Sequence, residues 1–141
     1  MVDNLRFRDD DPADEPAVTL DAFLDQANAA SVRIEPGDDV RRLIPVLDRV
    51  RLVEVDFPRF RDGRGYSSAR ILREAGYKGE LKAVGDVLVD QILFMRRCGF
   101  DSFAPDAPID EEVLARALER YRHVYQPAED GLKPVWALRH G

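Results

Sequence analysis

Arginines and carboxylates gather in one short stretch of the chain, from Val53 to Arg70. Its sequence, VEVDFPRFRDGRGYSSAR, joins an alternating apolar segment to a glycine-bearing loop and then to a helical pattern. Backbone N–H groups and the positive end of a helix dipole converge at such a junction, and arginines add forked donors that suit an oxyanion. We therefore predict an anion- or partner-binding surface formed by Arg59, Asp62, Arg64, Tyr66, Ser67, Ser68 and Arg70.

A second segment, residues 85–91, is predicted to follow a parallel strand and to reach the same edge of the sheet. It adds Asp90 and Gln91 to the binding surface. Paired carboxylates can perform general acid–base chemistry, which makes Asp56 and Asp86 the candidate catalytic residues. The structural alternative is that Asp86 caps a helix and that the other carboxylates hold the arginines in place.

Other motifs are weak. The loop itself could be a tight turn with solvated charges, and its glycine spacing matches neither a P-loop nor a dinucleotide fingerprint. We predict no metal site from the two histidines, His123 and His140, which lie far along the chain from the loop, although an all-oxygen magnesium site stays open. Cys98 is expected to be a buried small hydrophobe, with redox or nucleophilic use as the alternative.

Composition limits the class of protein. With 141 residues, 45% hydrophobic and 34% charged, the chain has the size and make-up of one soluble domain. The net charge of −6 is concentrated in residues 1–16, which carry six acids and two arginines. This balance argues against a nucleic-acid partner, and no apolar run has the length of a membrane span. A single cysteine excludes an internal disulfide, so we expect a cytoplasmic protein.

Hydrophobic periodicity and turn residues predict the elements along the chain. We expect strands at 31–36, 52–57, 80–86 and 100–105, a short edge strand at 4–7, and an edge strand or packing segment at 134–138. Helices are expected at about 20–28, after Asp38 or Asp39 with a kink at Pro45, at 67–75 with Ser67 as N-cap, at 87–98, and from Asp110 onward. Gly76 and Gly99 should end two of them, and the helix at 87–98 should be buried on most sides.

These elements alternate as four successive strand–helix units. Such connections require parallel strands and right-handed crossovers, so the fold class is α/β, with either an open sheet or a half-barrel. We divide the chain into an acidic, largely mobile segment, 1–17, and a single α/β domain, 18–141.

The run from Asp56 to Phe103, DFPRFRDGRGYSSARILREAGYKGELKAVGDVLVDQILFMRRCGFDSF, resembles the bacterial domain-of-unknown-function family nine-three-four. The family pattern is close to FPxFxDGRGYSxARxLRxxxGYxGELRAxGDVLxDQxxxMxRCGFDxF, and Arg61 stands where a threonine is more usual. Members are described as oxidoreductases connected with sulfite reduction, because they tend to be encoded beside assimilatory sulfite reductase. The resemblance therefore implies sulfite reductase as a partner.

No flavin, nicotinamide, siroheme or iron–sulfur motif accompanies this resemblance, so the cofactor is unknown and enzymatic activity is an open question. The leading hypothesis is an accessory protein of sulfur assimilation. Two alternatives stay open. One is a stand-alone enzyme that uses aspartate acid–base chemistry on an anionic substrate. The other is a structural homodimer in which two half-barrels complete one another.

Overall fold

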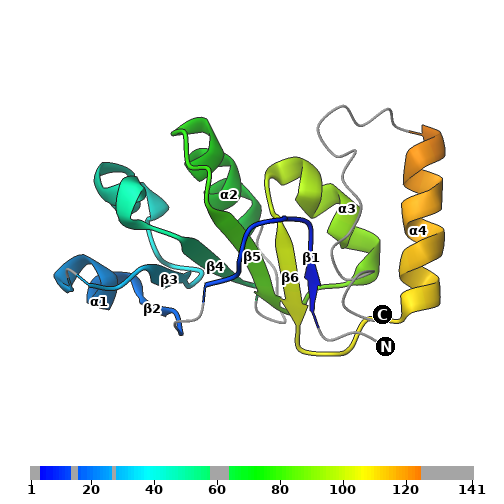
Figure 1. The fold of residues 1–141 in the computed structure, drawn as a ribbon, viewed down its shortest axis with the longest axis horizontal. Helices are drawn as coiled ribbons and strands as arrows, with labels where there is room; N and C mark the ends of the chain where they lie inside the picture. The colour runs from blue at the N-terminus through cyan, green and yellow to red at the C-terminus, as the bar shows by residue number, and fades with distance from the viewer. Residues whose placement is uncertain (1–3, 14–15, 27, 58–63, 125–141) are drawn as a thin grey trace.

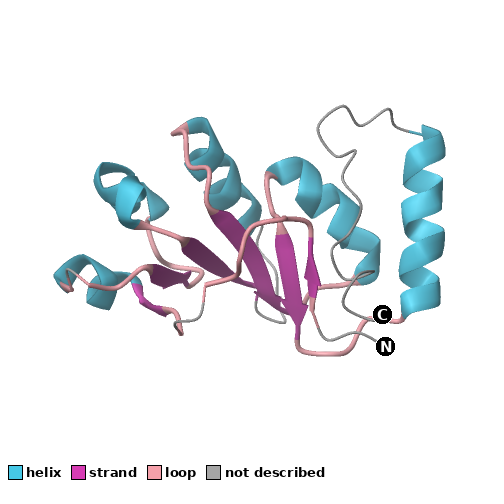
Figure 2. Ribbon diagram, in the orientation of Figure 1, coloured by secondary structure: helices cyan, strands magenta, loops and turns pink. Residues whose placement is uncertain are grey.

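The computed structural model describes residues 4–13, 16–26, 28–57 and 64–124 of the chain. They form a mixed α/β structure around one open, six-stranded sheet, with the strands in the middle and helices ranged along the sheet (Figure 2). The strand order is β1-β6-β5-β4-β3-β2. The strands are β1 (Leu5–Arg6), β2 (Val18–Thr19), β3 (Ser31–Ile34), β4 (Leu52–Phe57), β5 (Glu80–Gly85) and β6 (Ser102–Pro105).

Five neighbouring strands, β2 to β6, run parallel in the order in which the chain makes them. This confirms the prediction of parallel pairing through helical crossovers. β4 spans the residues that its alternating pattern predicted, and it pairs with β5 along its whole length. The prediction of four strand–helix units does not account for β2, which pairs with β3, or for β1, which pairs antiparallel with β6 at the other edge (Figure 1).

Helical segments follow the strands. They are α1 (Leu20–Asp25), the 3-10 segment η1 (Val40–Arg49), α2 (Arg64–Glu74), α3 (Val89–Cys98) and α4 (Glu111–Val124). Asp39 caps η1 by accepting from the Arg41 N–H at 3.1 Å, and the backbone is kinked at Val46, directly after Pro45. The predicted kink is confirmed. Because proline lacks an N–H and crowds the preceding turn, a regular helix cannot continue through this point.

Glycines end two helices, as predicted. Gly76 and Gly99 have φ angles of +97° and +119°, the left-handed conformation that a side chain disfavours. After Gly76, the Tyr77 N–H donates to the Leu72 carbonyl at 3.0 Å, which satisfies a carbonyl at the end of α2. Both stop signals are local, which is why they can be read from the sequence.

Two predicted N-caps, Ser67 and Asp86, are wrong. α2 begins at Arg64, so Ser67 lies inside the helix. A Cβ atom at Gly65 would lie 2.5 Å from the Phe57 ring, so the helix starts where it can approach β4 closely. α3 has Leu88 as its N-cap residue, without a side-chain cap. The Asp86 N–H donates to the Phe57 carbonyl and the Val87 N–H to the Gly85 carbonyl, so the chain turns at Asp86 before the helix begins.

One hydrophobic core lies between the helices and one face of the sheet. Every second strand residue points into it, and the buried apolar residues of α1, η1, α2 and α3 belong to the same cluster. Members from the strands include Val32, Ile34, Val53, Val55, Phe57, Leu81, Ala83 and Phe103. Since sequential parallel strands with right-handed crossovers carry their helices on the same side, this one-sided core is the expected outcome of the topology.

The opposite face of the sheet carries charged side chains. The register places Arg33, Glu54 and Lys82 side by side on β3, β4 and β5, with Asp56 one step along β4 and Glu35 just after β3. We call these five residues the charged face. Leu52 and Val84 are also buried on this side, and they lie outside the core cluster. The two faces therefore differ in chemistry, as the alternation along the strands predicts.

The acidic N-terminal segment supplies part of the sheet. β1 confirms the predicted edge strand, and Arg6 is 6% exposed. Its guanidinium donates to Glu80 at 3.0 and 3.1 Å, and Ser102 donates to the second Glu80 oxygen at 2.7 Å. Because β1 and β2 lie at opposite edges, the segment between them crosses the sheet (Figure 1). Mobility of residues 1–17 stays a prediction.

α3 is less buried than predicted. Ile92, Met95 and Cys98 are buried, whereas Leu88 and Phe94 are 51% and 54% exposed. The helix therefore presents one apolar side to the core and another to the surface, where Phe94 contacts the Tyr66 ring with centroids 5.3 Å apart. No helix among the described residues is long and apolar enough to cross a membrane.

Candidate functional site

The carboxyl ends of β3 and β4 bring two acidic side chains to one arginine. Arg33 lies 3.1 Å from Glu35 through Nε and 3.4 Å from Asp56 through a terminal nitrogen. The Nε contact is an ion pair without hydrogen-bond geometry. Glu54 lies 4.0 Å from the same guanidinium. The arrangement joins Asp56, a predicted catalytic residue, to Glu35, which the sequence analysis did not single out.

Glu35 is the acid whose proton affinity the site changes. Burial raises the pKa of Glu35, and the hydrogen bond and negative charge of Asp56 raise it further, while Arg33 opposes the shift. Asp38 adds a second negative charge nearby, and its carboxylate accepts from the Glu35 N–H at 2.8 Å. The raised pKa favours the protonated form of Glu35. Such a group can give and take a proton, the basic requirement of acid–base chemistry.

The β5 end of this edge is tightly fitted. Gly85 has a φ angle of +96°, and a Cβ atom there would lie 2.4 Å from the Phe57 carbonyl oxygen and 2.9 Å from Asp56 Oδ1. Only glycine allows the β4 and β5 backbones to meet in this way. The absence of a side chain at Gly85 leaves room for the Asp56 carboxylate, and Asp86 follows it directly, half-buried. The prediction that Asp56 and Asp86 lie at one edge is consistent with the β4–β5 register.

The remaining predicted residues fall into three groups. Arg59 and Asp62 lie outside the described residues, and only the backbone of Arg64 is described, at the start of α2. Tyr66 is half-buried against Phe57 and Phe94, and Ser68 is buried. Ser67, Asp90 and Gln91 lie in the first turns of α2 and α3, where Ser67 and Asp90 are exposed and Gln91 is half-buried.

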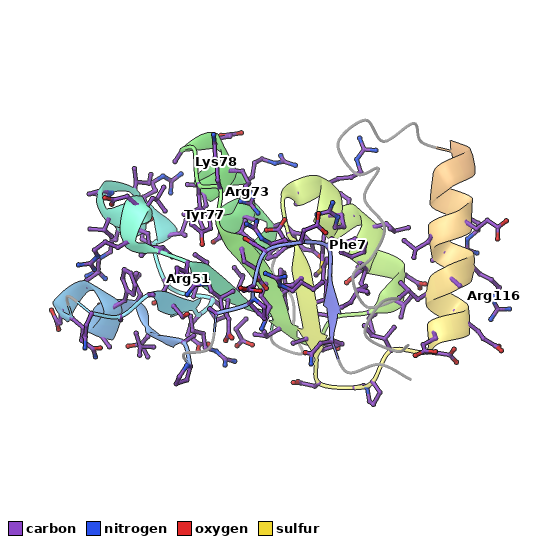
Figure 3. The ribbon with its side chains drawn as sticks, viewed as in Figure 1. Phe7, Arg51, Arg73, Tyr77, Lys78 and Arg116 are labelled. Carbon is purple, nitrogen blue, oxygen red and sulfur yellow. The ribbon has the colours of Figure 1, made fainter. Side chains whose placement is uncertain are left out.

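Arg70 lies elsewhere. It lines a hollow of about 700 Å³ formed by the ends of α2 and α3 and by the chain after β1. This hollow is at the amino ends of the strands, as its members Gly99 and Asp101, just before β6, show. Phe7 and Arg73, labelled in Figure 3, also line it. The structure therefore groups Arg70 with arginines of the other end of the sheet, a placement that the sequence reasoning missed.

Asp101 is the centre of the charges around this hollow. Its Oδ2 accepts from Arg73 at 2.5 Å, from Arg8 at 3.0 Å and from the Leu81 N–H at 3.2 Å, and Arg96 lies 3.6 Å from Oδ1. Arg8 also binds Asp10, which lowers the pKa of Asp10 to about 2. A single signal could have suggested this cluster: FD at 100–101 directly precedes a strand that pairs with an arginine-bearing edge strand.

The remaining candidates from the sequence are Cys98 and a metal site. Cys98 is buried, at 5% exposure, as predicted for a small hydrophobe. Within the described ranges, no group of three or more histidine, cysteine, aspartate or glutamate side chains is arranged to hold a metal ion. His123 is on α4 without a described side chain, and His140 lies outside the described residues.

Comparison with known proteins identifies a family. The family model described as Bacterial protein of unknown function (DUF934) matches residues 31–136, which include β3 to β6 and all five residues of the charged face. No curated protein and no solved structure matches the chain.

Proposed function

The chain belongs to this bacterial family, and we propose that it is an accessory protein of assimilatory sulfite reduction that docks on its partner through the charged face and the adjoining carboxyl ends of β3–β5. The connection with sulfite reduction comes from the resemblance of residues 56–103 to the family pattern. The docking role comes from the sheet.

The observation that carries the docking role is the one-sided core of a nearly all-parallel sheet. Parallel sheets are almost always covered on both faces. Here the buried apolar residues of α1, η1, α2 and α3 all belong to the core on one face, whereas the other face carries the charged residues, of which Arg33 and Glu35 are 41% and 46% exposed. A partner that covers the charged face would give the sheet its second layer.

The chemistry of this face favours a polar partner over a free oxyanion. Its described charges are two cations, Arg33 and Lys82, and three acids, and both predicted catalytic aspartates lie at the same edge. Carboxylates repel a small oxyanion, whereas a protein surface can match both signs of charge. An oxyanion site in the loop at 58–63 stays a separate prediction.

Co-purification from the native host tests this proposal. Tagged wild-type protein should capture sulfite reductase, and Arg33→Glu should reduce the captured amount at least tenfold, because it reverses the charge at the centre of the face. Arg116→Glu, at an exposed position on α4, is the matched control and should capture normally. Absence of the reductase from the wild-type sample, or equal capture by both variants, would overturn the proposal.

Sedimentation of the purified protein separates docking from self-association. A wild-type dimer that Arg33→Glu converts to a monomer would assign the charged face to a second copy of the chain, and it would replace the docking proposal. A monomeric wild type leaves the face for another protein.

A second candidate function is acid–base catalysis on an anionic substrate. The coupling of Glu35 with Asp56 beside Arg33 favours it. Asp56→Asn keeps the size of the side chain and removes its acid–base role, so it should fail to support growth on sulfate while still capturing the reductase. If Asp56→Asn instead loses both growth on sulfate and capture of the reductase, the result points to docking.

A further inference from the structure

We propose that the hollow between the ends of α2 and α3 binds a tetrahedral oxyanion, either free or as the head group of an organic phosphate or sulfate ester. This site is separate from the charged face, because it lies at the amino ends of the strands. Its volume of about 700 Å³ is within the range of small-molecule sites and exceeds what a single inorganic ion fills.

The charge of the hollow favours an anion. Five of its lining residues are arginines and four are acids. Two of the four acids are engaged: Asp101 faces three guanidiniums, and Asp10 binds Arg6 and Arg8. Since the neighbouring guanidiniums offset the negative charge of these two carboxylates, they repel an entering anion less strongly.

One of the arginines is a fixed part of the frame. All five N–H groups of Arg73 are used: they donate to the carbonyls of Tyr77, Gly79 and Gly99 and to Asp101. Arg73 therefore satisfies carbonyls after the ends of α2 and α3, where the helix dipoles would otherwise repel an anion. It cannot also donate to a ligand.

Other arginines keep donors for a ligand. Arg8 uses three of its five N–H groups, on Asp10 and Asp101. Arg70 is exposed and makes no hydrogen bond or ion pair with the described part of the chain. Two guanidiniums that line one hollow and still have free forked donors match the geometry of a phosphate or sulfate group. Arg70 is the residue on which the proposal depends most.

Isothermal titration with sodium sulfate, sodium phosphate and adenosine monophosphate tests the site, with sodium chloride at matched ionic strength as the blank. We expect saturable binding, and Arg70→Ala should raise the Kd about tenfold or more, because it removes a charge-assisted hydrogen bond to the anion. Arg70→Lys should recover part of it, because lysine keeps the charge without the fork. Arg116→Ala, exposed on α4 (Figure 3), should bind as the wild type does.

Comparing the affinities for inorganic phosphate and for adenosine monophosphate shows whether the site binds a free oxyanion or an organic ester. Affinity for the nucleotide at least tenfold above that for inorganic phosphate assigns an organic ester, and equal affinity assigns the free ion. Absence of saturable binding, or equal behaviour of Arg70→Ala and Arg116→Ala, would overturn the proposal. Because Arg70 is remote from the charged face, capture of sulfite reductase by Arg70→Ala should be normal, so the two proposals fail independently.

Discussion

Two arginine–carboxylate clusters lie on this sheet, and they differ in burial. At the amino ends of the strands, Arg6 and Glu80 are 7% and 6% exposed through their side chains, and every N–H of the Arg6 guanidinium has an acceptor. At the carboxyl ends, Arg33 and Glu35 are 41% and 46% exposed, and their contact lacks hydrogen-bond geometry.

The comparison teaches that the same chemistry has two uses. A buried pair with all donors satisfied holds β1 to β5 across the sheet, and loss of one partner leaves an uncompensated charge. A half-exposed pair is screened by water and contributes little to stability, so its charges are available for other groups. We therefore assign the first cluster to folding and the second to function.

The largest expected effect tests the buried cluster. Glu80→Ala removes the acceptor of Arg6 and Ser102 and should lower the free energy of unfolding by about 3–5 kcal/mol, measured by urea denaturation. Glu54→Ala, on the charged face one strand away, should cost less than about 1 kcal/mol. Similar losses in both variants would break the distinction between the clusters.

The next effect concerns the backbone that positions the carboxyl-end cluster. Gly85→Ala should cost about 2–4 kcal/mol, because it adds a strained φ angle to a clash with the Phe57 carbonyl. Gly76→Ala is the control: its φ angle is nearly the same, but a Cβ atom there would have nothing within 4 Å, so about 1 kcal/mol is expected. A Gly85 variant no worse than the Gly76 variant would remove the steric argument.

A smaller effect is expected from the charged face itself. Arg33→Ala should change the free energy of unfolding by less than about 1 kcal/mol, and that difference should shrink at high salt, because the pairs are half-exposed. Thermal unfolding at low and high ionic strength measures it. A loss of several kcal/mol that salt does not alter would make this cluster structural as well.

The smallest effect concerns Glu35, and its size depends on pH. A raised pKa of Glu35 in the folded protein means that the native state binds more protons than the unfolded state between pH 4.5 and the folded pKa, so stability falls as pH rises through that window. Glu35→Gln should remove this loss: it should melt slightly higher than the wild type at pH 8 and equally at pH 4. Solvent screening limits the gain to about 0.5 kcal/mol. A variant that melts lower at pH 8 would contradict the coupling with Asp56.

The amino-acid sequence by itself determined the local elements and the fold class. The alternation in LVEVDF gave β4, the spacing between strands required parallel pairing, and Gly76 and Gly99 marked helix ends. These features depend on neighbours in the chain: side chains alternate along any strand, and a glycine in the left-handed conformation interrupts the helical hydrogen-bond pattern locally. For the same reason, Pro45 predicted the kink at Val46.

Only the tertiary structure decided where helices begin and which charges meet. α2 starts before Ser67, where Gly65 packs close to the Phe57 ring. Asp86 is held at the end of β5 by the hydrogen bond from its N–H to the Phe57 carbonyl, and α3 starts only at Val89. The β3–β4 register brings Glu35 and Asp56 to the same guanidinium, that of Arg33. Arg70, predicted to join the loop at the carboxyl ends of the strands, lines the hollow beside Arg73 instead. Each of these outcomes depends on groups that are distant in the sequence and adjacent in the fold, and the energy of a charge depends on such neighbours and on the water they exclude.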